Sequence, residues 1–196
     1  MHAAGKIRIV FVGDSITEWW QDTSYWAESF AAQSLNLGIA GDRTEDVLWR
    51  LQDRNRGGLG QLADPDIQPD VITLMIGTNH LWDEGRDAAD TIVAGQMAVI
   101  TRLRSLRPQA HILVHCVLPT GDAALNRTMV EPLNRRLAEA VSRLAGMSFL
   151  DLYPDFVDVD GRGPRHLFPD GVHLSEEGYR LWRDLLLPEL ERLKLP

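Results

Sequence analysis

Residues 7–20 have the sequence IRIVFVGDSITEWW, in which a β-branched apolar run stops abruptly at Gly13. The run Ile7–Val12 is short and apolar on both faces, as a buried strand of a parallel sheet is. The residues after it are able to form a helix, so Ser15 falls between the carboxyl end of a strand and the amino end of a helix. Unpaired backbone N–H groups at such a junction favour negative charge. The stretch therefore predicts a place where an anion is bound or formed, and helix capping by Asp14 or Ser15 is the purely structural alternative.

The length and charge of the chain narrow the class of protein. Its 196 residues suit one α/β domain over residues 1–196, and the net charge of −8 argues against a general nucleic-acid-binding protein. The apolar runs are too short to cross a bilayer, and Met1–Lys6 lead into the first strand without the apolar region of a signal peptide. A cytoplasmic location is the default expectation. The single cysteine, Cys116, is expected to pack in the core, and no intrachain disulfide is possible.

Strand patterns alternate with helical patterns along the chain. Further strands are expected at residues 35–38, 70–76, 111–117 and 149–152, and helices at residues 25–34, 44–51, 88–106, 126–145 and 175–193. Thr44 and Ser175 are the expected N-caps of two of these helices. The alternation predicts parallel pairing through right-handed crossovers, and hence an α/β sheet that is covered by helices on both faces.

Three of the expected strands end in small or polar residues, at Gly13–Ser15, Gly38–Asp42 and Gly77–Asn79. Ligands bind at the carboxyl ends of the strands in sheets of this kind, so these segments are expected to face the same rim. A glycine loop after a strand also suggests nucleotide binding, but the chain has neither a dinucleotide fingerprint nor a Walker lysine. We therefore expect a small-molecule site of another kind at this rim.

The chain offers each part that a serine nucleophile needs. Ser15 becomes nucleophilic when a neutral imidazole takes its proton, and His173 is the best placed of the six histidines because Asp170 lies three residues before it. On a helical turn residues three apart share a face, so the Asp170 carboxylate is able to orient the ring. His166 is the rival base, but no carboxylate precedes it at that spacing. Taken alone, an Asp-x-x-His pair is also common in surface turns.

A tetrahedral oxyanion needs N–H donors that already point at it. The backbone N–H groups of Gly41 and Ser15 and the side-chain amide of Asn79 form a credible set of three. Each residue also has a structural alternative, because Asn79 suits a turn with unusual backbone angles and Gly41 suits a tight turn.

The four blocks Gly13–Ser15, Asn36–Gly41, Gly77–Asn79 and Asp170–His173, in that order, resemble the SGNH (GDSL-type) hydrolase family. The name stands for Ser, Gly, Asn and His, and the matching residues here are Ser15, Gly41, Asn79 and His173. The resemblance covers almost the whole chain. It implies a flavodoxin-like, three-layer α/β/α fold around a five-stranded parallel sheet. It also implies hydrolysis of esters or thioesters by a triad of Ser15, His173 and Asp170, without metal or cofactor.

Within this family, residues 36–51 look most like the catalytic subunits of platelet-activating factor acetylhydrolase type Ib. That likeness implies a short acyl pocket and acetyl esters as the leading substrate class. The chain departs from the family pattern at His80, where many members carry Asp or Asn, and at Ile16, where the name motif has Leu. A thioesterase or a lysophospholipase with a longer acyl preference, and a non-catalytic binding subunit of the same fold, therefore stay open. A homo-oligomer also stays open.

Aromatic residues near the blocks are candidates for the substrate walls. Trp19 or Trp20 is expected to border the pocket while the other packs inside, and Trp82 and His80 follow Asn79 closely enough to contact substrate. Such rings suit a sugar or a lipid chain equally. The other histidines and tryptophans in strand or helix patterns are expected to be structural: Trp26, Trp49, Trp182, His111 and His115.

Overall fold

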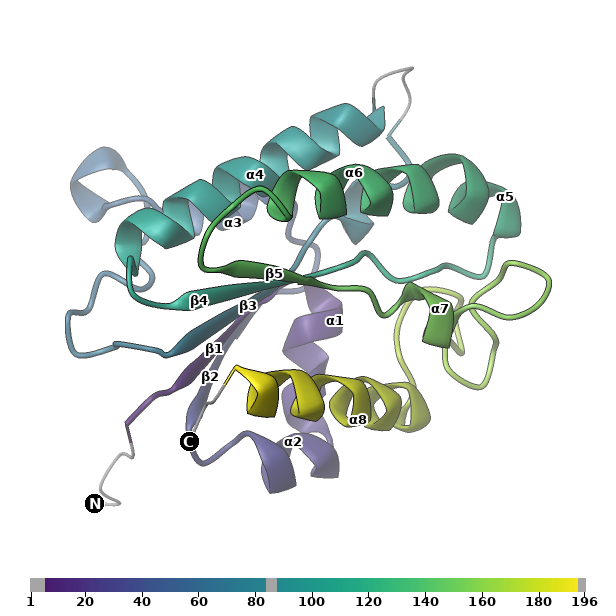
Figure 1. The fold of residues 1–196 in the computed structure, drawn as a ribbon, viewed down its shortest axis with the longest axis horizontal. Helices are drawn as coiled ribbons and strands as arrows, with labels where there is room; N and C mark the ends of the chain where they lie inside the picture. Colours follow the sequence, from purple (N-terminus) through teal and green to yellow (C-terminus); the bar gives the residue numbers. More distant parts are fainter. Residues whose placement is uncertain (1–5, 84–87, 194–196) are drawn as a thin grey trace.

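The computed structural model describes residues 6–83 and 88–193, and its centre is a sheet of five parallel strands (Figure 1). The strands lie in the order β2-β1-β3-β4-β5. Their bounds are β1 Ile9–Gly13, β2 Ser34–Gly38, β3 Val71–Met75, β4 His111–His115 and β5 Met147–Leu150. The predicted α/β class and the five-stranded parallel sheet are confirmed. The expectation for the first residues of the chain falls mostly on positions 1–5, which lie outside the described residues.

Helices cover both faces of the sheet (Figure 1). One layer holds α1, α2 and α8, and the other holds α3, α4 and α6. The α-helices are α1 Ser15–Glu18, α2 Ser24–Ser29, α3 Thr44–Leu51, α4 Ala88–Leu106, α5 Ala123–Leu125, α6 Glu131–Val141, α7 Tyr153–Phe156 and α8 Glu176–Arg192. Short 3₁₀ turns η1 Trp19–Asp22, η2 Arg54–Arg56 and η3 Thr78–His80 and the π-helical turn η4 Asn126–Val130 complete the list.

The alternation of side chains along β1 divides the core into two halves. Phe11 packs among the aromatic residues of the α1, α2 and α8 layer, whereas Val10 and Val12 pack with the aliphatic residues of the α3, α4 and α6 layer. Successive residues of a strand point to opposite faces. All three side chains are at most 1 % exposed, so β1 is the buried central strand that its sequence predicts.

Helix α8 docks on the segment that follows β1. The indole rings of Trp20 and Trp182 stack with their centroids 4.1 Å apart, and the Tyr179 hydroxyl donates a hydrogen bond to the Ile16 carbonyl over 2.9 Å. The segment just before α8 contains Asp170 and His173. This docking therefore brings the segment that contains Asp170 and His173 to the carboxyl end of β1.

The three strands that carry the small and polar ends finish at the same level. Gly13 pairs with Gly38 of β2 and with Met75 of β3. Gly38 also allows α1 to approach, because a Cβ at this position would lie 2.3 Å from the Glu18 backbone nitrogen. The loops after β1, β2 and β3 consequently start side by side, as predicted.

Several element boundaries differ from the prediction. The helix expected over residues 25–34 ends at Ser29, because Ser34 already pairs with Ile9 in the sheet. The N-cap of α3 is Arg43, not Thr44, and the Asp46 carboxylate accepts the Arg43 backbone N–H. The N-cap prediction for Ser175 is confirmed, since its hydroxyl accepts the Gly178 N–H.

The helix expected over residues 126–145 is three joined segments. It begins earlier, at α5, and passes through the π-helical turn η4 before α6. Pro132 lies in the first turn of α6, and because proline has no N–H to donate to the preceding turn, a regular helix cannot run through it unchanged. The helix ends at Val141, earlier than predicted.

The core prediction for Trp49 is wrong. Its side chain is 48 % exposed and donates to the Gly57 carbonyl. Val47 and Leu51 take the buried face of α3, and a residue two positions from each of them points to the opposite side of a helix. Trp26, Trp182 and Cys116 are buried as predicted.

No helix in the described part of the chain has both the length and the apolar composition that crossing a bilayer would require.

Candidate active site

Ser15, His173 and Asp170 form a continuous chain of contacts, although Ser15 and His173 are 158 positions apart. Ser15 Oγ lies 2.9 Å from His173 Nε2, and His173 Nδ1 lies 2.7 Å from Asp170 Oδ2. The other oxygen of Asp170 accepts the backbone N–H groups of Val172 and His173. Such an arrangement is able to pass a proton from the serine to the imidazole.

The ionisation of Asp170 fixes the tautomer of the ring. Partial burial opposes the charge, but hydrogen bonds from the backbone and ring of His173 and from Val172 outweigh it and lower the pKa of Asp170 to about 2. Asp170 is therefore a carboxylate at neutral pH and accepts a hydrogen bond from the N–H group at His173 Nδ1. That leaves the lone pair of Nε2 facing the Ser15 hydroxyl.

Trp19 and Trp20 divide as expected. Trp20 is completely buried, whereas Trp19 is 41 % exposed and its ring lies against the His173 imidazole with centroids 4.2 Å apart. Trp19 thus borders the site and limits the ring positions open to His173.

The loop after β2 presents Gly41 with its backbone N–H free. Gly41 has φ +83°, in a turn closed by the Asp42 N–H and the Ile39 carbonyl. Within the described residues its N–H has no hydrogen-bond partner, and a Cβ built on it would meet nothing within 4 Å. The neighbouring Ala40 N–H donates to the Glu18 carboxylate over 2.6 Å. Glu18 thereby anchors this loop to the helix that begins at Ser15.

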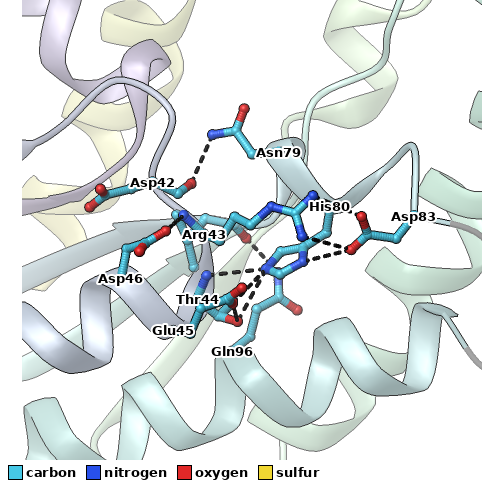
Figure 2. A network of polar contacts seen from close by, with 10 residues as sticks. Asp42, Arg43, Thr44, Glu45, Asp46, Asn79, His80, Asp83 and Gln96 are labelled. Atoms are coloured by element: carbon cyan, nitrogen blue, oxygen red, sulfur yellow. Dashed lines mark hydrogen bonds and ion pairs between the residues drawn. The ribbon is translucent and has the colours of Figure 1, made fainter.

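The loop after β3 carries Asn79 toward the same place. One Nδ2 hydrogen of Asn79 is donated to the Asp42 carbonyl over 2.8 Å, which leaves the other for a ligand. Figure 2 shows this contact together with a wider polar network between the two loops. The structure therefore brings Asn79 next to the Gly41 turn.

His80 and Trp82, the two predicted substrate contacts after Asn79, differ in their exposure to solvent. Trp82 is 57 % exposed, while His80 is 7 % exposed. The ring nitrogens of His80 contact Asp83 and Thr44 inside the protein (Figure 2). The structure thus gives His80 partners within the protein, whereas the sequence placed it among the substrate contacts.

A buried ion pair between Arg50 and Asp42, which the sequence analysis missed, anchors the loop that contains Gly41. Arg50 is 2 % exposed and donates from Nε to Asp42 Oδ2 over 2.7 Å, while its Nη1 reaches the Leu37 carbonyl. The signal was present in the sequence, because Arg50 lies on the same face of α3 as Val47 and would be placed in the core by helical spacing.

The remaining histidines lie away from this chain of contacts. His166 is exposed, and its backbone carbonyl accepts the Ser175 hydroxyl. His115 is buried and its Nδ1 accepts the Trp182 indole N–H. His111 pairs with Ser148 across neighbouring strands. Among the histidines that the structure describes, only His173 is within hydrogen-bonding distance of Ser15.

Asp14 caps α1, as one of the two alternatives from the sequence had it, since its Oδ1 accepts the Ile16 N–H. Its burial was not predicted: the side chain is completely buried, and Oδ2 has no hydrogen-bond partner among the described residues. Removal from water raises the pKa of Asp14 to about 7, against the hydrogen bonds that lower it. Next to Ser15, then, lies a carboxyl group that is half protonated near neutral pH.

Asp14→Asn should therefore change how stability depends on pH. The pKa of Asp14 is about 7 in the folded protein against an ordinary 3.8, so the folded state binds the proton more tightly and loses stability as the pH rises from about 4 to about 7. Asparagine keeps the capping oxygen and has no proton to lose. In urea unfolding at pH 4, 6 and 8, the free energy of unfolding of Asp14→Asn should rise relative to that of wild type as the pH rises. Equal slopes for both proteins would contradict this, and the exposed substitution Asp66→Asn is the control.

The match to a known protein family covers all four of the sequence blocks named above. The sequence model of the GDSL-like lipase/acylhydrolase family matches residues 11–181. The platelet-activating factor acetylhydrolase IB subunit alpha1 of Rattus norvegicus is 34% identical over 176 residues, which cover 87% of this chain and 69% of the relative.

Solved structures with the same fold include a GDSL-like lipase from Bacteroides thetaiotaomicron, with a TM-score of 0.73 and 21% identity over 95% of this chain and 89% of that chain. An acetylxylan esterase from Geobacillus stearothermophilus has a TM-score of 0.63 and 20% identity over 97% of this chain and 96% of that chain. The resemblance predicted from the four sequence blocks is confirmed.

Proposed function

The chain belongs to the GDSL-like lipase/acylhydrolase family of carboxylic ester hydrolases, and from this premise we propose that it cleaves short-chain esters, acetyl esters above all, with Ser15 as nucleophile. The observation that carries the proposal is the unbroken contact chain from Ser15 Oγ through His173 to Asp170. The proposed binding partner of the protein is its substrate, a small-molecule ester.

The geometry supports a two-step acyl transfer. Ser15 Oγ attacks the ester carbonyl as His173 Nε2 takes its proton, and the imidazolium that forms is stabilised by the Asp170 carboxylate. The oxyanion is held by the N–H groups of Gly41 and Ser15 and by the Asn79 amide. His173 then returns the proton to the leaving alcohol. In the second step, water attacks the acyl carbonyl while His173 Nε2 takes its proton. The bond to Ser15 Oγ then breaks, the carboxylic acid leaves, and His173 returns the proton to Ser15 Oγ.

The acyl preference is inferred from relatives. The acetylhydrolase subunits and the acetylxylan esterase are both named for the removal of acetyl groups. This supports a short acyl pocket in the present protein. The alcohol part of the substrate is not part of the proposal, because the exposed Trp19 and Trp82 suit sugars and lipids alike.

A series of p-nitrophenyl esters tests the acyl preference. We expect kcat/KM to fall by about tenfold or more from acetate to butyrate and again to octanoate, since each added methylene that a pocket cannot accept is worth about 1–3 kcal/mol. Initial rates at matched substrate concentrations below KM give the ratios. A rate that rises toward octanoate would favour a lysophospholipase, and a preference for acetyl thioesters over acetyl esters would favour a thioesterase.

A further inference from the structure

The loops that follow β2 and β3 are joined by more than the Asn79 contact. Arg43, two residues after Gly41, donates from Nη1 and Nη2 to the two carboxylate oxygens of Asp83, at 3.1 and 2.7 Å. The same Asp83 carboxylate lies 3.1 Å from His80 Nδ1. Asp83 thus contacts the loop that carries Gly41 and the residue next to Asn79 at the same time (Figure 2).

The hydrogen bonds around His80 determine which nitrogen carries the proton. The Thr44 backbone N–H donates to His80 Nε2 over 3.2 Å, so Nε2 offers a lone pair and Nδ1 carries the hydrogen. Nδ1 donates that hydrogen to Asp83. The Thr44 hydroxyl donates to Glu45 over 3.2 Å. Its oxygen also lies 3.2 Å from His80 Nε2, and the Glu45 carboxylate lies 3.4 Å from the same nitrogen. His80 therefore joins the start of α3 to the loop after β3.

We propose that Arg43, His80 and Asp83 form a latch that sets the distance between the two oxyanion donors, Gly41 N–H and the Asn79 amide. The inference rests on the proposed function, since it assigns the reason why these donors must be held together. None of the three latch residues contacts the reacting atoms in this account. They are positioning residues, and His80 acts through its chain neighbour Asn79 and through Thr44.

The exposure of the latch argues that it serves the site more than the fold. The side chains of Arg43 and Asp83 are 38% and 40% exposed, and ion pairs that reach water contribute little to folding. Donor placement, in contrast, matters steeply, because a shift of about 1 Å can cost about 10²-fold in rate. The Arg43–Asp83 ion pair should therefore affect kcat far more than the melting temperature.

The first experiment compares three variants by steady-state hydrolysis of p-nitrophenyl acetate. His80→Ala should lower kcat about 10- to 100-fold with KM changed less than about threefold. His80→Gln, whose amide oxygen is able to accept the Thr44 N–H, should recover part of this loss. His111→Ala removes an imidazole from the amino end of β4, where its Nε2 contacts Ser148, and should leave kcat near wild type. Equal losses in His80→Ala and His111→Ala would overturn the latch.

A double-mutant cycle shows whether His80 acts through Asn79. If it does, His80→Ala should cost clearly less in the Asn79→Ala background than in wild type, because the donor that it places is already missing. Losses that multiply in full, with KM unchanged, would mean that His80 acts independently of Asn79 and would overturn the proposal.

Nitrogen-15 NMR of the wild-type protein and of the two alanine variants reads the latch without catalysis. The His80 signals should show a protonated Nδ1 and an unprotonated Nε2. His80→Ala should shift the Gly41 amide and Asn79 side-chain signals, whereas His111→Ala should leave the Asn79 signals unchanged. The opposite tautomer, or unmoved signals, would overturn the latch. A wild type that hydrolyses none of the esters but shows these signals would instead reject the proposed function and keep the latch.

Discussion

Ser15→Ala is expected to lower the hydrolysis of p-nitrophenyl acetate by roughly 10⁶-fold, the scale known for loss of a serine nucleophile in other hydrolases. The serine hydroxyl contacts His173 and belongs to the first residue of α1, whereas the neighbouring Ile16 packs in the core. The melting temperature should therefore stay near that of wild type. Stopped assays at high enzyme concentration measure the residual rate, and thermal unfolding checks the fold.

Covalent labelling by a fluorophosphonate gives the same prediction independently of turnover. Wild type should gain one adduct on Ser15, found by mass spectrometry of the digested protein, and Ser15→Ala should gain none. The exposed substitution Ser142→Ala should label as wild type does. An unlabelled wild type would point to a binding subunit that keeps the fold, and retained turnover in Ser15→Ala would remove Ser15 from the mechanism.

Asp170→Asn is expected to lower kcat by roughly 10⁴-fold, as amidation of the triad carboxylate does in other serine hydrolases. The asparagine oxygen is still able to accept the backbone N–H groups of Val172 and His173. Its amide nitrogen, however, would donate to His173 Nδ1. The ring would then carry its proton on Nε2, which cannot accept the proton of Ser15.

The measurement is kcat for p-nitrophenyl acetate with thermal unfolding as a check on the fold. Asp160→Asn, at an exposed position in the preceding loop, is the matched control and should keep wild-type rates. A loss of less than about tenfold in Asp170→Asn would contradict the role of Asp170 as the group that orients His173.

The sheet and the outline of the site could be predicted because they depend on local patterns. Apolar β-branched runs that end in small residues marked the strands, and right-handed parallel connections then placed their ends at one rim. The spacing of Asp170 and His173 predicted a contact that the structure shows at 2.7 Å. The choice of His173 as the partner of Ser15 was inferred from the spacing of Asp170 and was strengthened by the family resemblance. In the structure the approach of His173 to Ser15 depends on the stacking of Trp20 and Trp182, which no local pattern encodes.

The latch and the surroundings of Asp14 could not be predicted, because they depend on how two loops meet. His80 follows Asn79 in the sequence, and that neighbourhood suggested a wall of the cleft; the 3₁₀ turn η3 instead turns its ring toward Thr44. Trp49 failed for a simpler reason. Its helix has one buried face, and an aromatic residue two positions from that face lies in water whatever its hydrophobicity.

The docking of α8 onto the segment after β1 also has a consequence for shortened forms of the protein. Ser15 and His173 lie 158 positions apart, and the indole of Trp182 stacks on Trp20 in the segment that follows Ser15. A form truncated just before Trp182 loses this stacking. Under the proposed mechanism, such a form would keep both Ser15 and His173 but lose the packing that holds them together.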